Sequence, residues 1–298
     1  MRYLCIGECM VEMAPQADPG SYRMGYAGDT LNTAWYLRQL MPDARVGYLT
    51  AVGQDAVSDA MLAFLAGAGI DTAHVQRRGD RTVGLYLIQL TGAERSFAYW
   101  RGQSAARTLA QDAGVLDAAL TGADVAYLSG ITLAILADAD RARLLDRLGA
   151  WRAGGGRVVF DPNLRPRLWD DTATMCRAVM QAAAVSDTVL PSYDDEAAWF
   201  GDTDPAATAA RYAAADVTEV VVKNGDGPML ALCDGTTVTV TPPPVARVVD
   251  TTAAGDSFNA GYMAARAGGA DPAAALAAGA ALAGRVIGTR GALLHLDG

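Results

Sequence analysis

VVDTTAAGDSFNAGYMAA, residues 248–265, is the most informative stretch of the 298-residue chain. An apolar strand end leads through five small residues, 251–255, into an amphipathic helix that contains Phe258 and Tyr262. Small residues let a backbone approach a ligand closely, and the first turn of a helix offers unpaired N–H groups at its positive dipole end. The stretch therefore predicts a strand–turn–helix unit of an α/β protein, with a turn that suits a phosphoryl group.

Asp256 lies in the first turn of this predicted helix. In that position its carboxylate could accept a proton from an alcohol that attacks a phosphoryl group. The alternative interpretation is that Asp256 only caps the helix. The stretch taken alone leaves both interpretations open, because a carboxylate at a helix N-terminus serves either purpose.

Outward from this unit, short apolar runs alternate with longer Ala- and Leu-rich stretches. The predicted strands are residues 3–7, 46–50, 125–130, 157–161, 188–191 and 219–223, and the predicted helices include residues 31–40, 56–66, 138–153 and 173–184. This alternation is typical of βαβ units around a mainly parallel sheet with helices on both faces. Since no long Pro-, Gly- or Ser-rich linker interrupts the chain, we expect a single domain over residues 1–298.

Two segments break this alternation. Residues 83–90 and 95–101, joined by TGAE, predict a β-hairpin with aromatic and arginine side chains, and residues 11–26 are turn-rich without a helical period. We expect these parts, approximately 11–26 and 81–103, to form a small β-sheet that projects as a lid. The alternative is that the hairpin is an ordinary edge of the main sheet. An exposed lid edge invites pairing, so we also expect a homo-oligomer formed through the lid.

Charge and rare residues exclude several classes of protein. The net charge of −9 argues against a nucleic-acid partner, because binding phosphate backbones requires a basic surface. No apolar run approaches the roughly 20 residues of a membrane span, so we expect a cytoplasmic protein with reduced thiols and no membrane partner. Lys223, the single lysine, lies in VVVKNG, which excludes a Gly-Lys-Ser/Thr phosphate loop. The two histidines and four cysteines show no zinc-binding or CxxC spacing.

Three motifs carry a resemblance to a known family. Residues 250–261, DTTAAGDSFNAG, resemble the D-T-x-G-A-G-D-x-F signature of the ribokinase-like (PfkB) carbohydrate kinases, with Ala253 in place of a glycine. Residues 26–37, YAGDTLNTAWYL, resemble the substrate-side G-G-x-x-x-N motif, and residues 221–230, VVKNGDGPML, resemble the strand–turn–strand beside the nucleotide. The resemblance implies a three-layer α/β/α fold with a mainly parallel central sheet and a small β-sheet lid.

Within this family, the chain resembles the members that act on 2-keto-3-deoxygluconate. The similar stretches are IGECMVEM (6–13), AGDTLNTAWYL (27–37), FAYWRGQSAAR (97–107), SGITLAIL (129–136), FDPNLRPRLW (160–169) and LPSYDDEAAWFGD (190–202). The resemblance implies transfer of the γ-phosphoryl group of ATP, with Mg²⁺, to the 6-hydroxyl of that small-molecule sugar acid. The alternatives are a PfkB kinase of another sugar, of the fructokinase or ribokinase type, and a non-catalytic sugar-acid sensor.

The resemblance also assigns roles to individual residues. Asp256 is implied as the catalytic base, with the backbone N–H groups of Ala253, Ala254, Gly255 and Asp256 as an anion hole. The implied substrate-binding residues are Gly28, Asp29, Asn32, Tyr86, Tyr99, Arg101 and Arg165, and the implied nucleotide-binding residues are Ser192, Lys223, Gly225, Gly227 and Gly255. Asp161, Asn163 and Glu196 are implied to place Mg²⁺ through water, and a monovalent cation is a further candidate cofactor.

The two arginines fit an acidic substrate on chemical grounds as well. Arginine forks hold carboxylates bidentately, which a kinase of a neutral sugar does not need. Two assignments have alternatives: Arg165 could face the nucleotide phosphates instead, and Asp195 could replace Glu196 as the acidic residue near the metal.

Overall fold

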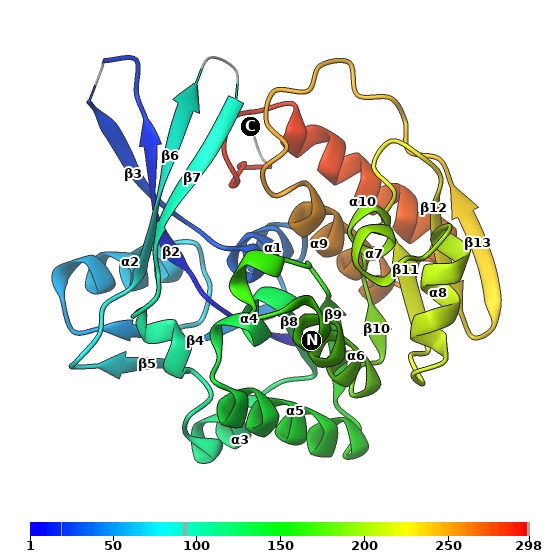
Figure 1. The fold of residues 1–298 in the computed structure, drawn as a ribbon, viewed down its shortest axis with the longest axis horizontal. Helices are drawn as coiled ribbons and strands as arrows, with labels where there is room; N and C mark the ends of the chain where they lie inside the picture. Colours follow the sequence, from blue (N-terminus) through cyan, green and yellow to red (C-terminus); the bar gives the residue numbers. More distant parts are fainter. Residues whose placement is uncertain (19, 92–93, 297–298) are drawn as a thin grey trace.

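The computed structural model describes residues 1–18, 20–91 and 94–296, which form two β-sheets and their flanking helices (Figure 1). In spatial order, the strands of the nine-stranded sheet are β13 (Thr236–Val240), β12 (Met229–Cys233), β11 (Glu219–Val222), β10 (Thr188–Val189), β9 (Arg157–Asp161), β8 (Val125–Ser129), β1 (Arg2–Ile6), β4 (Arg45–Gly53) and β5 (Val75–Arg78). All pairs from β11 to β5 are parallel, and only β11–β12 and β12–β13 are antiparallel. The prediction of a mainly parallel sheet is therefore confirmed.

Helices cover both faces of this sheet. In chain order they are α1 (Asp29–Leu40), α2 (Ala56–Gly67), α3 (Ala113–Thr121), α4 (Gly130–Ile135), α5 (Asp138–Ala153), α6 (Thr172–Ala184), α7 (Tyr193–Phe200), α8 (Pro205–Ala213), α9 (Ala254–Ala267) and α10 (Pro272–Ile287). Two short 3₁₀ turns, at Ala105–Thr108 and Pro166–Leu168, complete the helical elements of the described residues. None of the helices in the described residues is both long and apolar enough to cross a membrane.

The central strands separate two hydrophobic cores. On β1, Tyr3 and Cys5 belong to the core that includes side chains of α1, α9 and α10. Their neighbours Leu4 and Ile6 belong to the opposite core, with side chains of α3, α5 and α6. Because successive side chains of a strand point to opposite faces, apolar residues at consecutive positions require a layer of helices on each side. The three-layer α/β/α architecture is therefore confirmed.

The smaller sheet has the strand order β3 (Tyr22–Ala27), β2 (Met10–Pro15), β6 (Gly84–Thr91) and β7 (Glu94–Trp100). Strands β2 and β6 pair in parallel, and the two outer pairs are antiparallel. The predicted hairpin is thus part of a separate sheet, and its alternative placement at the edge of the main sheet is wrong. Residues 92–93 of the predicted TGAE turn, residue 19 of the predicted lid and residues 297–298 of the predicted domain lie outside the described residues. The lid role and the single domain stay predictions.

The parallel strands bring several chemistry-bearing residues to one edge. Strands β1, β8 and β9 end side by side: Ile6 is opposite Leu128, and Ser129 is opposite Asp161. Helices α1, α4 and α9 begin near this edge, where the Thr132 hydroxyl of α4 donates to the Ile6 carbonyl at 2.8 Å. Ligand sites of open α/β sheets lie at the carboxyl ends of the strands. A ligand site is therefore expected at this edge of the large sheet.

The last described residues pack along α1. The Tyr36 hydroxyl donates to the Ala292 carbonyl at 2.7 Å, and the Leu294 N–H donates back to the same hydroxyl at 3.0 Å. The Trp35 indole N–H donates to the Leu294 carbonyl at 3.0 Å. The segment after α10 is thereby attached to the helix that begins at Asp29.

Candidate active site

The turn before α9 presents its backbone toward the strand ends. Ala253 precedes the helix with a φ of 62°, and no side chain caps the helix N-terminus. The Ala254 N–H donates to the Thr251 carbonyl at 3.2 Å. Helix geometry gives the N–H groups of Gly255 and Asp256 no acceptor within the helix. Of the N–H groups predicted to form an anion hole, that of Ala254 is therefore engaged within the turn, whereas those of Gly255 and Asp256 have no partner within the helix.

Asp256 is held by the first turns of α1. The Asn32 side-chain amide donates to Asp256 Oδ2 at 2.7 Å, and the Thr33 hydroxyl donates to the Asp256 carbonyl at 3.2 Å. Gly28, just before α1, lets the start of the helix lie against the backbone at Glu8, because a Cβ there would lie 2.1 Å from the Glu8 carbonyl oxygen, and its N–H lies 3.5 Å from the Asn32 side-chain oxygen. The predicted residues Gly28, Asn32 and Asp256 therefore lie together. Since the Asp256 side chain bonds to α1, it is not simply a cap of its own helix.

Asp256 is one of three carboxyl groups in this region. Asp29 at the start of α1 accepts a hydrogen bond from the Asn163 amide at 2.9 Å, and Asp161 ends β9. Burial, followed by the charge of Asp29, raises the pKa of Asp256 to about 8, although Asn32 stabilises its ionised form. Burial and the charge of Asp161 also raise the pKa of Asp29. A carboxyl group with a pKa near neutrality is suited to general base catalysis.

Lys223 forms a compact buried cluster below the turn. Its ammonium group donates to Asp161 Oδ2 at 3.3 Å and to the Asn259 side-chain oxygen at 3.1 Å. The Asn259 amide donates to the same oxygen of Asp161 at 2.7 Å. A Cβ on Gly255 would lie 3.6 Å from the ammonium nitrogen, so the positive charge is directly beside the turn. The sequence did not reveal Asn259 as the partner of Lys223. Asn259 lies on a helix and Lys223 follows a strand, and only the folded structure brings the two side chains together.

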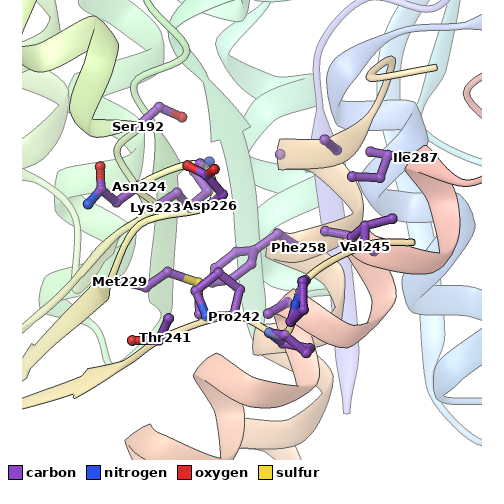
Figure 2. A pocket seen from close by; sticks show the side chains of 18 of the residues that line it. Ser192, Lys223, Asn224, Asp226, Met229, Thr241, Pro242, Val245, Phe258 and Ile287 are labelled. Atoms are coloured by element: carbon purple, nitrogen blue, oxygen red, sulfur yellow. The ribbon is translucent and has the colours of Figure 1, made fainter. Parts of the chain in front are cut away.

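A cavity of about 770 Å³ adjoins the turn (Figure 2). Lys223, Ala254 and Gly255 line it where it meets the turn, and two further residues predicted to bind the nucleotide, Ser192 and Gly225, line it as well. Its apolar wall includes Met229, Pro242, Val245, Phe258 and Ile287. Gly227 does not line the cavity, but its N–H donates to the Asn224 carbonyl at 2.7 Å and closes the turn after β11. The cavity therefore suits a ligand with a flat apolar part and an anionic part directed at Gly255.

The predicted aromatic wall and one predicted arginine belong to the smaller sheet. Tyr86 and Tyr99 are directly opposite one another on β6 and β7, with ring centroids 5.9 Å apart. The Tyr86 hydroxyl donates to the carboxylate of Glu12 on β2. Arg101, which follows β7, forms an ion pair with Glu8, and their side chains are only 10% and 1% exposed. Sequence reasoning missed this pair, because the two residues meet only when the small sheet folds over the end of β1.

The two predicted arginines have different surroundings. Arg165 is 51% exposed, and its guanidinium lies 3.4 Å from the carboxylate of Asp195. The charges of Asp161 and Lys223 act on the pKa of Asp195, which burial raises above its ordinary value. Arg165 is therefore grouped with Asp195 and the strand end at Asp161, while Arg101 is held by Glu8. Neither Arg165 nor Asp195 lines the cavity, so the choice between the sugar acid and the nucleotide phosphates for Arg165 stays a prediction.

Glu196 is in a different place from its neighbour Asp195. It is fully buried, the Arg211 guanidinium donates to it at 2.6 Å, and the Tyr212 hydroxyl donates at 3.0 Å. Burial raises the pKa of Glu196 to about 7 in spite of Arg211. The assignment of Glu196 near the metal is therefore corrected, because its carboxylate joins α7 to α8 inside the protein. Adjacent helical residues point about 100° apart, which places Asp195 on the side of Arg165.

The residues expected near a metal are already engaged by the protein. Asp161 accepts from Lys223 and Asn259, and the Asn163 amide donates to Asp29. Over residues 1–18, 20–91 and 94–296, no three His, Cys, Asp or Glu side chains form a group that could hold a metal ion. This donor set does not fit a resident metal, and it leaves only a metal that arrives with its own anionic ligand.

The raised pKa of Asp256 has a consequence for stability. Folding favours the protonated Asp256, so its contribution to stability falls as the pH rises from about 4 to about 8 and is constant above that window. We therefore expect Asp256→Asn to raise the melting temperature relative to wild type by an amount that grows from about pH 5 to about pH 8. Calorimetry across this range measures the difference. The exposed Asp43, changed to Asn, is the control, and a difference independent of pH for Asp256→Asn would contradict the assignment.

Known proteins resemble this chain over almost its whole length. The model of the pfkB family of carbohydrate kinases matches residues 2–297. The 2-dehydro-3-deoxygluconokinase of Dickeya dadantii is 41% identical, covering 98% of this chain and 96% of that protein, and the enzyme of the same name from Escherichia coli K12 is 40% identical, covering 97% and 96%.

A solved structure extends the likeness to the fold. The putative ribokinase II of Escherichia coli, in complex with ATP and Mg²⁺, superposes with a TM-score of 0.84 at 24% identity, covering 98% of this chain and 94% of that one. The fold, the turn at Gly255 with Asp256 beside it, and the full-length match agree. The chain belongs to the pfkB family of carbohydrate kinases.

Proposed function

We propose that the protein phosphorylates 2-dehydro-3-deoxygluconate, also called 2-keto-3-deoxygluconate, on its 6-hydroxyl with ATP as the donor. The observation that carries the proposal is the carboxylate of Asp256, which Asn32 holds beside the free N–H groups of the α9 turn. Relatives at about 40% identity over nearly the whole chain bear the name of this activity. The products are 2-dehydro-3-deoxy-6-phosphogluconate and ADP.

In the proposed reaction, Asp256 accepts the proton of the 6-hydroxyl as its oxygen bonds to the γ-phosphorus and the bond to the ADP oxygen breaks. The N–H groups of Gly255 and Asp256, together with the dipole of α9, stabilise the charge on the transferred group. Asn32 keeps the carboxylate in place at 2.7 Å. Because positioning and electrostatics account for most of the acceleration in phosphoryl transfer, this fixed geometry supports the activity.

The cavity beside Gly255 is proposed to take ATP. Its apolar wall suits the adenine ring, and its opening onto Gly255 suits the phosphates. Mg²⁺ would arrive with the phosphates and neutralise part of their charge, with Asp195 rather than Glu196 as the acidic side chain nearest to them. The four cysteines are free thiols, in keeping with the reducing cytoplasm, where we place the reaction.

The smaller sheet is proposed to cover the sugar acid as a lid. Tyr86 and Tyr99 would line the pocket, Asp29 and Asn32 would bind its hydroxyls, and Arg101 would bind the carboxylate. Glu8 supports this role for Arg101, because an ion pair from one side fixes the guanidinium and leaves its remaining N–H groups for a second carboxylate.

A coupled assay of ADP release across ketodeoxy sugar acids, fructose and ribose tests the function. We expect turnover with 2-dehydro-3-deoxygluconate and little with the neutral sugars. Asp256→Asn should fold normally and lose turnover by about 10²-fold or more, because the proton then has no acceptor. A preference for fructose or ribose would favour the other sugar kinases, and absence of ADP release with every acceptor would favour the sensor. The assay with and without K⁺ tests the monovalent cation.

Arg101→Ala tests the binding of the acid group. Loss of a charge-assisted pair is expected to raise KM for the sugar acid about 10- to 100-fold and to leave KM for ATP within about twofold. Arg165→Ala is the comparison, because its exposed side chain lies beside Asp195. Melting temperatures show whether loss of the Glu8 partner unfolds the protein. Equal changes of both KM values in Arg101→Ala would contradict the role.

Asp195 and Glu196 make a matched pair for the nucleotide side. Asp195→Asn should raise KM for ATP and the Mg²⁺ concentration required for half-maximal rate. Glu196→Gln should leave both values unchanged and lower the free energy of unfolding by about 1–3 kcal/mol, because Arg211 and Tyr212 lose a charged partner. Steady-state kinetics and urea unfolding measure the two effects. The reverse pattern would restore Glu196 as the acidic residue near the metal.

The outer face of the smaller sheet is proposed to pair two copies of the chain. Register places Trp100 opposite Leu85, and Met24 and Leu87 both opposite Met13, so these side chains share one face. Trp100 is 61% exposed, which is unusual for a large apolar side chain. Trp100→Asp should shift sedimentation from dimer to monomer, whereas Trp199→Asp on α7 should not. A wild-type monomer at high concentration would contradict the proposal.

A further inference from the structure

The cluster around Lys223 continues through the interior toward α1. The Asn259 amide, which donates to Asp161, also donates to the Tyr127 hydroxyl at 3.0 Å. The hydroxyl groups of Tyr127 and Thr33 lie 3.2 Å apart, and the Thr33 hydroxyl lies 3.2 Å from the Asp256 carbonyl oxygen. Polar groups from the residue after β11 and from β9, α9, β8 and α1 thus form one connected chain that ends at the backbone of Asp256.

Tyr127 is the junction of this chain. Its side chain comes from the middle of β8 and has no exposure to solvent. The two residues that contact its hydroxyl, Asn259 and Thr33, are also fully buried. The hydroxyl therefore contacts α9 on one side and α1 on the other, and no ligand in the site can touch it. Burial, followed by the charges of Asp161, Asp256 and Asp29, holds the pKa of Tyr127 well above its usual range, so the hydroxyl stays neutral.

The two helices that meet at Tyr127 supply the two halves of the site. Helix α1 carries Asn32, one residue before Thr33, and α9 carries Asp256, three residues before Asn259. A buried hydroxyl that loses its partners is costly, so both helices are held at the distance at which Tyr127 satisfies them. The Asn32–Asp256 hydrogen bond of 2.7 Å depends on that same distance.

We propose that Tyr127 is a positioning residue of the kinase reaction: its hydroxyl fixes the spacing between the first turns of α1 and α9, and thereby the placement of the Asp256 carboxylate. The proposal rests on the function given above, because it concerns the geometry of the base. A core tyrosine of purely structural importance would contribute stability and leave the geometry of Asp256 unchanged.

Tyr127→Phe removes the hydroxyl and keeps the ring. We expect kcat to fall about tenfold, because misplacement of a reacting group lowers the rate without weakening ground-state binding. KM for the sugar acid and for ATP should stay within about twofold. Hydrogen exchange measured by mass spectrometry should also show faster exchange of the amides in the first turns of α1 and α9.

Tyr48→Phe is the matched control. Tyr48 is also fully buried, lies on β4 of the same sheet, and has its hydroxyl 2.8 Å from the Thr30 hydroxyl of α1, but it has no bond to α9 in the described structure. Both variants lose a buried hydroxyl and should lose similar stability. Only Tyr127→Phe should lower kcat and loosen α9.

Thr33→Val adds a double-mutant test. If Tyr127 and Thr33 act through one chain, the double variant should have about the same kcat as the slower of the two single variants. Equal kcat and equal exchange in Tyr127→Phe and Tyr48→Phe would overturn the proposal, as would independent losses in the double variant. If the wild type releases no ADP with any acceptor, the proposed function fails, and the exchange of the two helix turns still tests the spacing role of Tyr127.

Discussion

Repulsion among Asp29, Asp161 and Asp256 is the constraint around which the site is built. Three carboxyl groups at one end of a sheet are unfavourable unless each is offset. The chain offsets them with asparagine side chains that each bridge two elements and with the single ammonium group of Lys223. Asp161 accepts from both Lys223 and Asn259, whereas the Asp256 carboxylate accepts from the Asn32 side chain. Burial and the charge of Asp29 raise the pKa of Asp256 in spite of Asn32.

The net charge of −9 counts the whole chain and includes the three carboxyl groups of this site. A protein of this charge that handles two anionic ligands must create positive potential locally. Here the sources are backbone N–H groups at the start of α9, the buried Lys223 and the arginines of the strand ends. The buried side chains among them, Lys223 and Arg101, are screened little by salt, in contrast to a basic surface patch.

Sequence reasoning worked where the signal is local and periodic. All six predicted strands lie in the large sheet. Short β-branched runs that alternate with amphipathic helices are typical of the central layer of an α/β fold, so their position in the sheet could be predicted. The turn at Gly255 and the start of α1 at Asp29 were also predictable, since small residues before a helix have a direct physical meaning. The separate position of the hairpin required the pairing of β2 with β6, which no local pattern contains.

The partners of the site's side chains could not be predicted from the sequence, for a different reason. Glu196 and Asp195 are chemically similar neighbours, and only the direction of α7 relative to Arg211 separates them. The pairing of Arg101 with Glu8 joins residues that are distant in the chain, and apolar periodicity carries no information about it. Tyr127 shows the same limit, because its sequence pattern is that of an ordinary core residue of a strand.

The bond between Asn32 and Asp256 spans 224 residues of sequence. The segment at 292–296, which packs along α1, lies later still. On the ribosome, the first half of the chain therefore emerges and begins to fold with α1 uncovered, and no nascent fragment that stops before α9 contains the base. Contacts of such separation slow folding. Until α9 and α10 are synthesised, the apolar face of α1 stays exposed. In this period the new chain is prone to aggregate and presents a surface that chaperones can bind.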